Sequence, residues 1–233
     1  MSLLDSAAPP KADPYLTSLI FGPSKTGKTT LAASGSGTLI LDLEGGTKSV
    51  RDTGAMVIPI PDWATFETVV LELITKPHGY TNVVLDSVTY LQEIAGQAAD
   101  LIGHILDQKK DPRQAYGKMN AMIRHKLIQL HNAPFHFTMT AQLRERDGED
   151  VEAGKYPLTP DVSPAIMKVV VALPDLICRT AIVRKGASTQ DVEYRVIFGP
   201  ETRSQVGNRD LDLPYDATGV TLDKLIDVYT GDK

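Results

Sequence analysis

The sequence predicts an α/β fold, in which a mostly parallel central sheet is flanked by helices. Three observations support this fold class. Short apolar runs alternate with longer segments whose apolar residues recur at helical spacing. A glycine-rich loop directly follows the first apolar run. The last two runs are separated by a short turn at 186–190, which predicts an antiparallel hairpin added to the C-terminal side of the sheet.

Strands are predicted wherever a short apolar run is bounded by glycine or polar residues. These runs are residues 15–22, 37–46, 81–87, 134–142, 175–185 and 192–200. Helices are predicted where apolar residues share one helical face, at residues 63–74, 91–105, 119–130 and 222–229. Residues 108–118 and 143–163 show neither pattern and are predicted to be loops, and loops as long as the second are usually functional or disordered.

The domain organisation follows from where the apolar patterns begin. Residues 1–14 hold three prolines among small and polar residues, which predicts a flexible N-terminal segment followed by a single domain over 15–233. The chain of 233 residues is 42% hydrophobic, which excludes a largely disordered protein. Its net charge of −5 excludes a generally basic surface, so any nucleic acid must bind a local patch or an assembly.

Cysteine, histidine and hydropathy patterns exclude further classes. Cys178 is the only cysteine, so neither an intrachain disulfide nor a cysteine-rich zinc site can form, and its expected place is the core. The five histidines show no metal-binding spacing. No apolar run is long enough to span a membrane, and the first residues lack the pattern of a signal peptide. We therefore expect a cytoplasmic protein with no membrane partner.

Residues 22–29, GPSKTGKT, match the G-x-x-x-x-G-K-T pattern of a Walker A loop. Its glycines let backbone N–H groups point at phosphate oxygens, while Lys28 supplies a positive charge to the β- and γ-phosphates and Thr29 a hydroxyl ligand for Mg²⁺. An apolar run precedes the loop and a helical segment follows it, as the motif requires. The predicted ATP-binding residues are Gly22, Pro23, Ser24, Lys25, Thr26, Gly27, Lys28, Thr29 and Thr30. The alternative is an ordinary glycine-rich turn.

Asp86 ends the apolar run TNVVLD and is the candidate Walker B aspartate. Since the carboxyl ends of parallel strands share one sheet edge, we expect Asp86 to lie near the Walker A loop and to reach Mg²⁺ through water. A cap for the following helix is the alternative role, and Ser87 can fill it as well.

Many P-loop ATPases of the AAA type carry a glutamate directly after the Walker B aspartate, where this chain has Ser87. A catalytic carboxylate must therefore come from elsewhere in the chain or be absent. Glu44 ends the run GTLILDLE at the same predicted sheet edge and can orient water for attack on the γ-phosphate. Asp42, two residues earlier and deeper in the strand, is the competitor. Glu44 can also be a plain strand-end acid before a Gly-Gly turn.

In this order, Walker A, the strand-end Glu44 and the pair Asp86-Ser87 resemble the RecA-like P-loop ATPases. That family next carries a strand ending in a polar sensor, and FHFTMTAQ (135–142) fits it. The resemblance implies a RecA-like core in which Gln142 contacts the γ-phosphate and signals its presence to the loop that follows. An ordinary strand-end glutamine is the alternative.

The chain is also similar, over roughly residues 15–230, to phage-encoded single-domain RecA-like proteins of the Sak type. The similarity rests on compact size, on AYGKMNAMIRHKLIQLHNAPFHFTMTAQ (115–142) and on TRSQVGNRDLDLP (202–214). It implies ATP-controlled binding or annealing of single-stranded DNA in the bacterial host cytoplasm. The implied partners are other copies of the chain, in a ring or filament, and a single-strand-binding protein.

In RecA-like ATPases, DNA is contacted by the loops after Walker B and after the sensor glutamine. Loop 143–163 is net negative here, which weakens phosphate binding, whereas loop 108–118 is basic and carries an aromatic residue. The DNA-binding candidates are therefore Lys109, Lys110, Arg113, Tyr116 and Lys118. A solvated charged loop is the alternative.

The same family completes its site with a basic residue from a neighbouring subunit. Arg203 and Arg209 are the candidates, because they follow the final predicted hairpin in a polar segment, and Arg184 and Lys185 are their competitors. Each can also be a surface residue without that role. Two other functions stay open: a nucleotide-switched regulatory or assembly ATPase that binds no DNA, and a small-molecule phosphotransferase, against which the acidic loop 143–163 argues.

Overall fold

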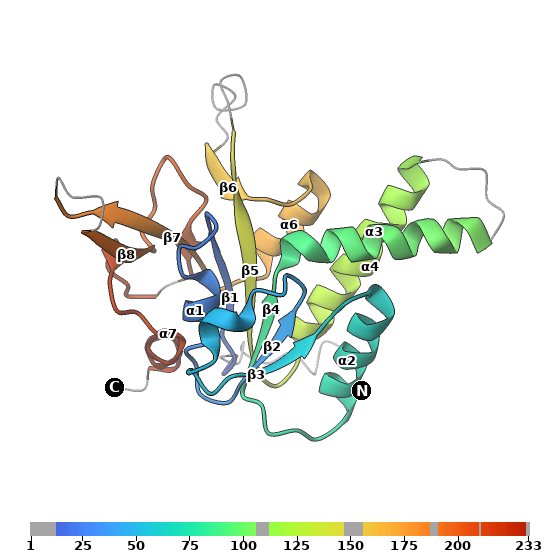
Figure 1. The fold of residues 1–233 in the computed structure, drawn as a ribbon, viewed down its shortest axis with the longest axis horizontal. Helices are drawn as coiled ribbons and strands as arrows, with labels where there is room; N and C mark the ends of the chain where they lie inside the picture. Colours follow the sequence, from blue (N-terminus) through green and yellow to red (C-terminus); the bar gives the residue numbers. More distant parts are fainter. Residues whose placement is uncertain (1–12, 106–111, 147–155, 187–190, 210, 232–233) are drawn as a thin grey trace, which may run out of the picture.

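The computed structural model describes residues 13–105, 112–146, 156–186, 191–209 and 211–231. Within them, one sheet of ten strands runs through the molecule. Its parallel part has the order β7-β1-β5-β4-β2-β3 (Figure 1). These strands are β1 (Thr17–Gly22), β2 (Thr38–Asp42), β3 (Met56–Pro59), β4 (Asn82–Asp86), β5 (His136–Glu145) and β7 (Leu176–Arg184).

Antiparallel strands extend this sheet. β8 (Val192–Ile197) pairs with β7 and β10 (Asp216–Ala217) pairs with β8, whereas β6 (Leu158–Pro160) pairs with β5 and β9 (Gly207–Asn208) with β7. The predicted α/β class, with a mostly parallel sheet and an added β7–β8 hairpin, is confirmed.

Helices cover both faces of the sheet because successive strand residues point to opposite sides. In β1, Leu19 and Phe21 enter one apolar cluster and Ile20 enters the other. The first cluster lies under α2 (Trp63–Thr75), α3 (Val88–Ile105), α4 (Pro112–His131) and α6 (Pro164–Ala172). The second lies under α1 (Lys28–Ala32), the 3-10 helix η2 (Thr47–Val50) and α7 (Leu222–Thr230). Cys178 is fully buried in the second cluster, and burial raises the pKa of its thiol to about 12.

The predicted loop at 108–118 is partly wrong, because α4 begins at Pro112. Proline suits the first turn of a helix, where its missing N–H costs no hydrogen bond, so Pro112 starts the helix instead of ending it. Consequently Arg113, Tyr116 and Lys118 belong to α4, while Lys109 and Lys110 lie outside the described residues.

The predicted loop at 143–163 is also partly wrong. β5 continues to Glu145 and pairs with β6, and α6 follows with Ser163 as its N-cap. Ser163-Pro164 was the signal for this helix, because serine caps N-termini and proline favours the first turn. The edge strand β3 was missed as well, since it has four residues, largely exposed, and ends in proline. No helix in the described ranges combines the length and apolarity needed to cross a membrane.

Strand register aligns the ends that carry the predicted site. Gly22 at the end of β1 pairs with Gln142 of β5, and Asp42 at the end of β2 pairs with Asp86 of β4. Because β5 lies between β1 and β4, the Walker A loop, Gln142 and Asp86 occur side by side at one sheet edge.

Candidate nucleotide-binding site

A cavity of about 920 Å³ opens at this sheet edge, over the Walker A loop. Residues 24–30 form its floor, and Glu44 and Gln142 contribute from the strand ends. Its other walls come from β8 and from the turn Gly219–Thr221 before α7. A volume of this size accommodates a ligand as large as a nucleotide.

Contacts with strand β7 help to hold the Walker A loop in place. The Thr26 hydroxyl lies 2.6 Å from the hydroxyl of Thr180 in β7 and donates to the Pro23 carbonyl at 2.7 Å. A Cβ at position 22 would lie 2.3 Å from the Thr180 hydroxyl oxygen, so glycine is required there. Lys25 and Gly27 have φ values of 64° and 91°. These left-handed residues curl the loop so that its backbone can surround an anion.

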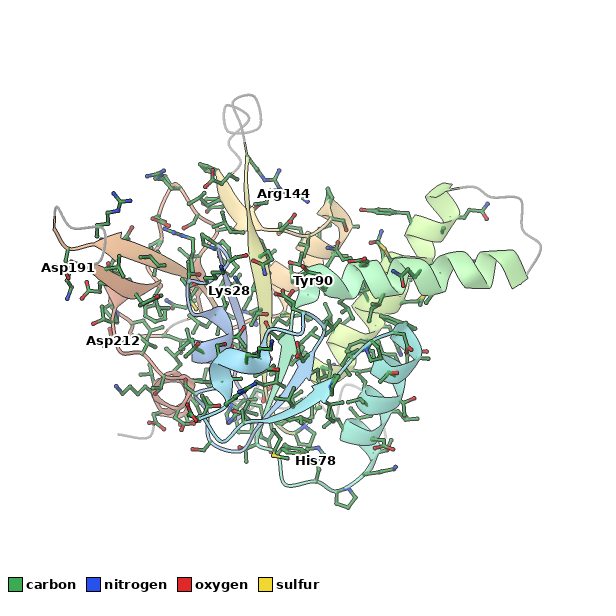
Figure 2. The ribbon with its side chains drawn as sticks, viewed as in Figure 1. Lys28, His78, Tyr90, Arg144, Asp191 and Asp212 are labelled. Atoms are coloured by element: carbon green, nitrogen blue, oxygen red, sulfur yellow. The ribbon has the colours of Figure 1, made fainter. Side chains whose placement is uncertain are left out.

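Lys28 is buried at the centre of the loop (Figure 2). Its Nζ donates to the carbonyl oxygens of Gly22 at 3.0 Å and Pro23 at 2.9 Å, and to Gln142 Oε1 at 3.2 Å. Desolvation lowers the pKa of Lys28, while the nearby carboxylates of Glu44 and Asp86 act in the opposite direction. The ammonium group has therefore lost part of its hydration, and a bound phosphate anion would compensate for this loss.

Asp86 and Thr29 form the candidate Mg²⁺ position. Thr29 Oγ1 donates to Asp86 Oδ2 at 2.9 Å, and the Thr140 hydroxyl donates to Asp86 Oδ1. Burial raises the pKa of Asp86, and these two hydrogen bonds partly oppose it. The described residues contain no group of three or more histidine, cysteine or acidic side chains that could hold a metal. A hydroxyl beside one carboxylate suits Mg²⁺, which takes oxygen ligands and keeps several waters or phosphate oxygens.

Replacing Asp86 with asparagine will stabilise the nucleotide-free protein, because it removes a buried charge and keeps a similar shape. We expect the melting temperature in EDTA at pH 8 to rise by roughly 2–4 °C. The raised pKa means that acid protonates Asp86 in the folded protein first, so the difference from the wild type narrows as pH falls. Calorimetry across this pH range checks the prediction, and an unchanged or lower melting temperature at pH 8 contradicts it.

Glu44 and Gln142 are joined in one hydrogen-bonded chain that reaches Lys28. The amide Nε2 of Gln142 donates to both carboxylate oxygens of Glu44, at 3.1 and 3.0 Å. Its Oε1 accepts from Lys28 and, at 3.3 Å, from the Ser24 hydroxyl. Ser87 donates from its hydroxyl to Glu44. The glutamine amide thus separates the lysine from the carboxylate.

Asp42 has a different environment from Glu44. Its Oδ1 accepts from the backbone N–H groups of Glu44 at 3.1 Å and Gly45 at 2.8 Å, and its Oδ2 from the Thr47 hydroxyl at 3.1 Å. Both oxygens are therefore used to hold the turn after β2. Glu44 is the carboxylate of the pair that lines the cavity.

Backbone hydrogen bonds connect Gln142 to two other elements. Its N–H donates to the Thr89 hydroxyl in α3 at 3.0 Å, and its carbonyl accepts from Asp161 N, just after β6, at 2.7 Å. Gln92 of α3 accepts from Ser163 N at 2.7 Å. A shift of Gln142 would therefore act on α3 and on the segment that leads into α6.

The structure places the candidate arginines away from the cavity lining. Arg203 is exposed beside β6, where its carbonyl accepts from Leu158 N at 2.8 Å. Arg209 lies at the opposite sheet edge, where its backbone N–H donates to the Asp175 carbonyl at 2.8 Å and its side chain pairs with Asp175 at 3.4 Å. Of their competitors, Lys185 pairs with Glu193 at 2.8 Å and Arg184 is exposed at the end of β7.

The DNA-binding candidates within the described residues, Arg113, Tyr116 and Lys118, belong to α4 and do not line the nucleotide cavity. Tyr116 is 45% exposed on the first turns of α4, and α3 and α4 project together from the sheet (Figure 1). In the acidic segment after Gln142, Arg144 pairs with Asp161.

Sequence reasoning missed the cavity walls that lie outside the predicted motifs. These walls are Tyr194, Arg195 and Val196 of β8, together with Gly219, Val220 and Thr221. Tyr194 could have been noticed in the sequence, because it is a large aromatic residue at an exposed position of a strand with alternating burial. Nothing in the sequence indicates where Gly219–Thr221 lies, because the position of this turn depends on how α7 packs.

Comparison with known proteins agrees with this geometry. A family profile described as an AAA domain matches residues 15–209, a range that contains the Walker A loop, Glu44, Asp86 and Gln142. A search of curated proteins gives no match. The match covers most of the chain and includes every strand that forms the phosphate end of the cavity. The chain therefore belongs to the AAA domain family of P-loop ATPases.

Proposed function

We propose that the protein is a Mg²⁺-dependent ATPase whose catalytic residues are Lys28, Glu44 and Gln142. The observation that supports this best is the hydrogen-bonded chain from Lys28 through Gln142 to Glu44. Phosphoryl transfer to water uses a cation that binds the phosphate and a carboxylate that accepts a proton from the water. Here a neutral amide lies between these two groups.

In the proposed mechanism, phosphate oxygens replace the loop carbonyls as acceptors for Lys28. Gln142 Oε1 then loses its lysine donor, and its amide turns toward the γ-phosphate. Glu44 in turn loses the amide donor and accepts a proton from the attacking water. The water oxygen bonds to the γ-phosphorus as the bond from that phosphorus to the β–γ bridging oxygen breaks, and ADP and phosphate leave. Mg²⁺, held through Thr29 and Asp86, would neutralise charge on the phosphates. Ser87, at the position where many AAA-type ATPases have glutamate, keeps Glu44 oriented by its hydrogen bond.

We further propose that the ATP state controls binding or annealing of single-stranded DNA by an oligomer, as in the phage recombination proteins of the Sak type. Gln142 supports this link, because its backbone contacts both α3 and the segment after β6. The described DNA-binding candidates, Arg113, Tyr116 and Lys118, lie on α4 outside the cavity lining. An array of subunits would therefore place many weak contacts along one DNA strand.

The test of this function is an ATPase assay with and without single-stranded DNA, run beside size-exclusion chromatography. We expect DNA to bind when ATP, Mg²⁺ and self-assembly are all present, and to dissociate steeply as salt rises. If the ATPase is active but no DNA binds at low salt, a nucleotide-switched regulatory ATPase replaces this reading. A phosphorylated small-molecule acceptor among the products would replace it with a phosphotransferase.

Two sets of variants sharpen the test. Changing Lys109, Lys110 and Arg113 to alanine should reduce DNA binding and leave DNA-independent ATPase intact. Alanine at Lys48, Lys76 and Lys168 removes the same charge elsewhere and is the control.

The arginine proposal is tested by mixing two inactive proteins. Arg203→Ala or Arg209→Ala keeps the Walker A loop, whereas Lys28→Ala keeps both arginines. If the mixture regains ATPase activity, the arginine acts in trans. In that case the Lys28→Ala subunit supplies its arginine to the nucleotide bound by the arginine mutant. Full activity of both arginine variants alone would exclude these two residues.

A further inference from the structure

The cavity lining includes residues outside the candidate phosphate-binding set. Besides the Walker A loop, Glu44 and Gln142, it contains Leu31 and Ser34, residues 194–196 of β8 and the turn Gly219–Thr221. In Figure 1, α7 lies on the same side of the sheet as α1, and β8 extends the sheet beyond β7. The phosphate-binding residues do not explain this part of the lining, which forms a second end of the cavity.

Tyr194 forms one side of this second end. It is 56% exposed, although large aromatic side chains are usually buried. Its Cδ1 atom lies 4.0 Å from the position that a Cβ would take at Gly27, so the ring stands directly beside the phosphate loop. An exposed ring face next to an anion-binding loop offers a stacking surface for a planar group.

The turn Gly219–Thr221 forms the other side, and the residues after it are hydrogen-bonded to the segment that follows α1. Leu222 N, which follows the turn, donates to the Ser34 hydroxyl at 2.8 Å. Asp223, the next residue, accepts from both the backbone N–H and the hydroxyl of Ser36, each at 2.8 Å. The wall is thus held in place before any ligand arrives, which lowers the entropy cost of binding.

The charge at this end argues against a second phosphate site. Arg195 is the basic residue of the β8 wall, and it already pairs with Glu193 at 2.7 Å and with Asp216 at 2.8 Å. Arg195 is thus already paired with two carboxylates, one of which, Glu193, also pairs with Lys185. Leu31, Val196 and Val220 supply apolar surface. An uncharged planar group suits these walls better than a phosphate does.

We infer that Tyr194 and the turn Gly219–Thr221 hold the base and ribose of the nucleotide whose phosphates occupy the Walker A loop. The inference rests on the proposed ATPase function and deepens it by assigning the nucleoside end of the site. Stacking on Tyr194 supplies affinity in proportion to ring area, so purine nucleotides bind more tightly than pyrimidine nucleotides.

Calorimetry with two ligands isolates the nucleoside end, because inorganic tripolyphosphate presents the phosphates alone. With Mg²⁺ present, we expect wild-type protein to bind ATP at least about tenfold more tightly than tripolyphosphate, and more tightly than CTP. Tyr194→Ala should weaken ATP by about tenfold and leave tripolyphosphate unchanged, whereas Tyr194→Phe should bind like the wild type. Val192→Ala, two residues away on the same face of β8, is the matched control.

The outcomes separate this inference from the function on which it rests. Unchanged ATP affinity in Tyr194→Ala overturns the base site while ATP binding stands. If Tyr194→Ala weakens the binding of ATP and of tripolyphosphate equally, Tyr194 has a structural role in the phosphate loop. This result also overturns the base site. If wild-type protein binds neither ligand, the proposed ATPase function itself is wrong. Thermal melting of each variant verifies that it is folded.

Discussion

Replacing Lys28 with alanine will lower the rate of ATP hydrolysis by at least about a hundredfold, the loss typical when a transition-state donor is removed. The side chain is buried, and its Nζ lies between two loop carbonyls and the amide oxygen of Gln142. A phosphate that displaces those carbonyls gains a charge-assisted hydrogen bond, which alanine cannot provide. A steady-state phosphate-release assay at saturating ATP measures the effect.

Folding should survive the Lys28→Ala change, because Lys28 lines the cavity and Pro23, Ser24 and Lys25 of the loop are exposed, so water can fill the space that the lysine leaves. Lys76→Ala is the matched control, since that lysine is exposed on the far end of α2 and pairs with Glu72. Circular dichroism of both variants should match the wild type. Near-normal turnover in Lys28→Ala would reject the ATPase proposal as a whole.

Replacing Glu44 with glutamine will lower turnover by about tenfold to a thousandfold while ATP still binds. Glutamine keeps the size of the side chain but cannot accept a proton from water. The carboxylate of Glu44 accepts two hydrogen bonds from Gln142 Nε2. A glutamine at position 44 can keep only one of them, because its terminal NH₂ group is itself a donor. Single-turnover kinetics beside equilibrium ATP binding separates the chemical step from affinity.

Asp42→Asn is the comparison for Glu44→Gln. Its Oδ1 accepts two backbone N–H groups and remains available in asparagine, while the bond from Thr47 to Oδ2 is lost. We expect a loss of about 1 kcal/mol in the free energy of unfolding and a milder effect on turnover. If Asp42→Asn abolishes hydrolysis and Glu44→Gln does not, the roles of the two carboxylates are reversed.

Local patterns in the sequence were sufficient for the phosphate loop and for the class of fold. The glycines of GPSKTGKT need particular backbone angles, and Lys28 and Thr29 follow at a fixed spacing, so the motif is readable within eight residues. Apolar runs of strand length alternating with helical periods likewise predict a parallel sheet with helices on both faces. Each of these inferences depends on neighbours along the chain.

Errors in the predicted elements occurred where a single residue has two meanings. Pro112 was interpreted as part of a loop, but it begins α4, because proline breaks a helix in its middle and favours its first turn. The segment after Gln142 looked irregular because charged residues dominate it, yet Leu143–Glu145 pair with β6. Pairing with a distant strand is not encoded in the composition of either strand.

Only the tertiary structure showed the different surroundings of Asp42 and Glu44 and which distant residues join them in the candidate site. Gln142 reaches Lys28 across 114 residues and Glu44 across 98, because β5 pairs with β1 and lies beside β4. Tyr194 reaches Gly27 because the β7–β8 hairpin joins the same sheet edge, and Ser34 fixes the start of α7 from 188 residues away. Spacing along the chain determines which chemistry is present, whereas strand order and register determine which groups come within hydrogen-bond reach.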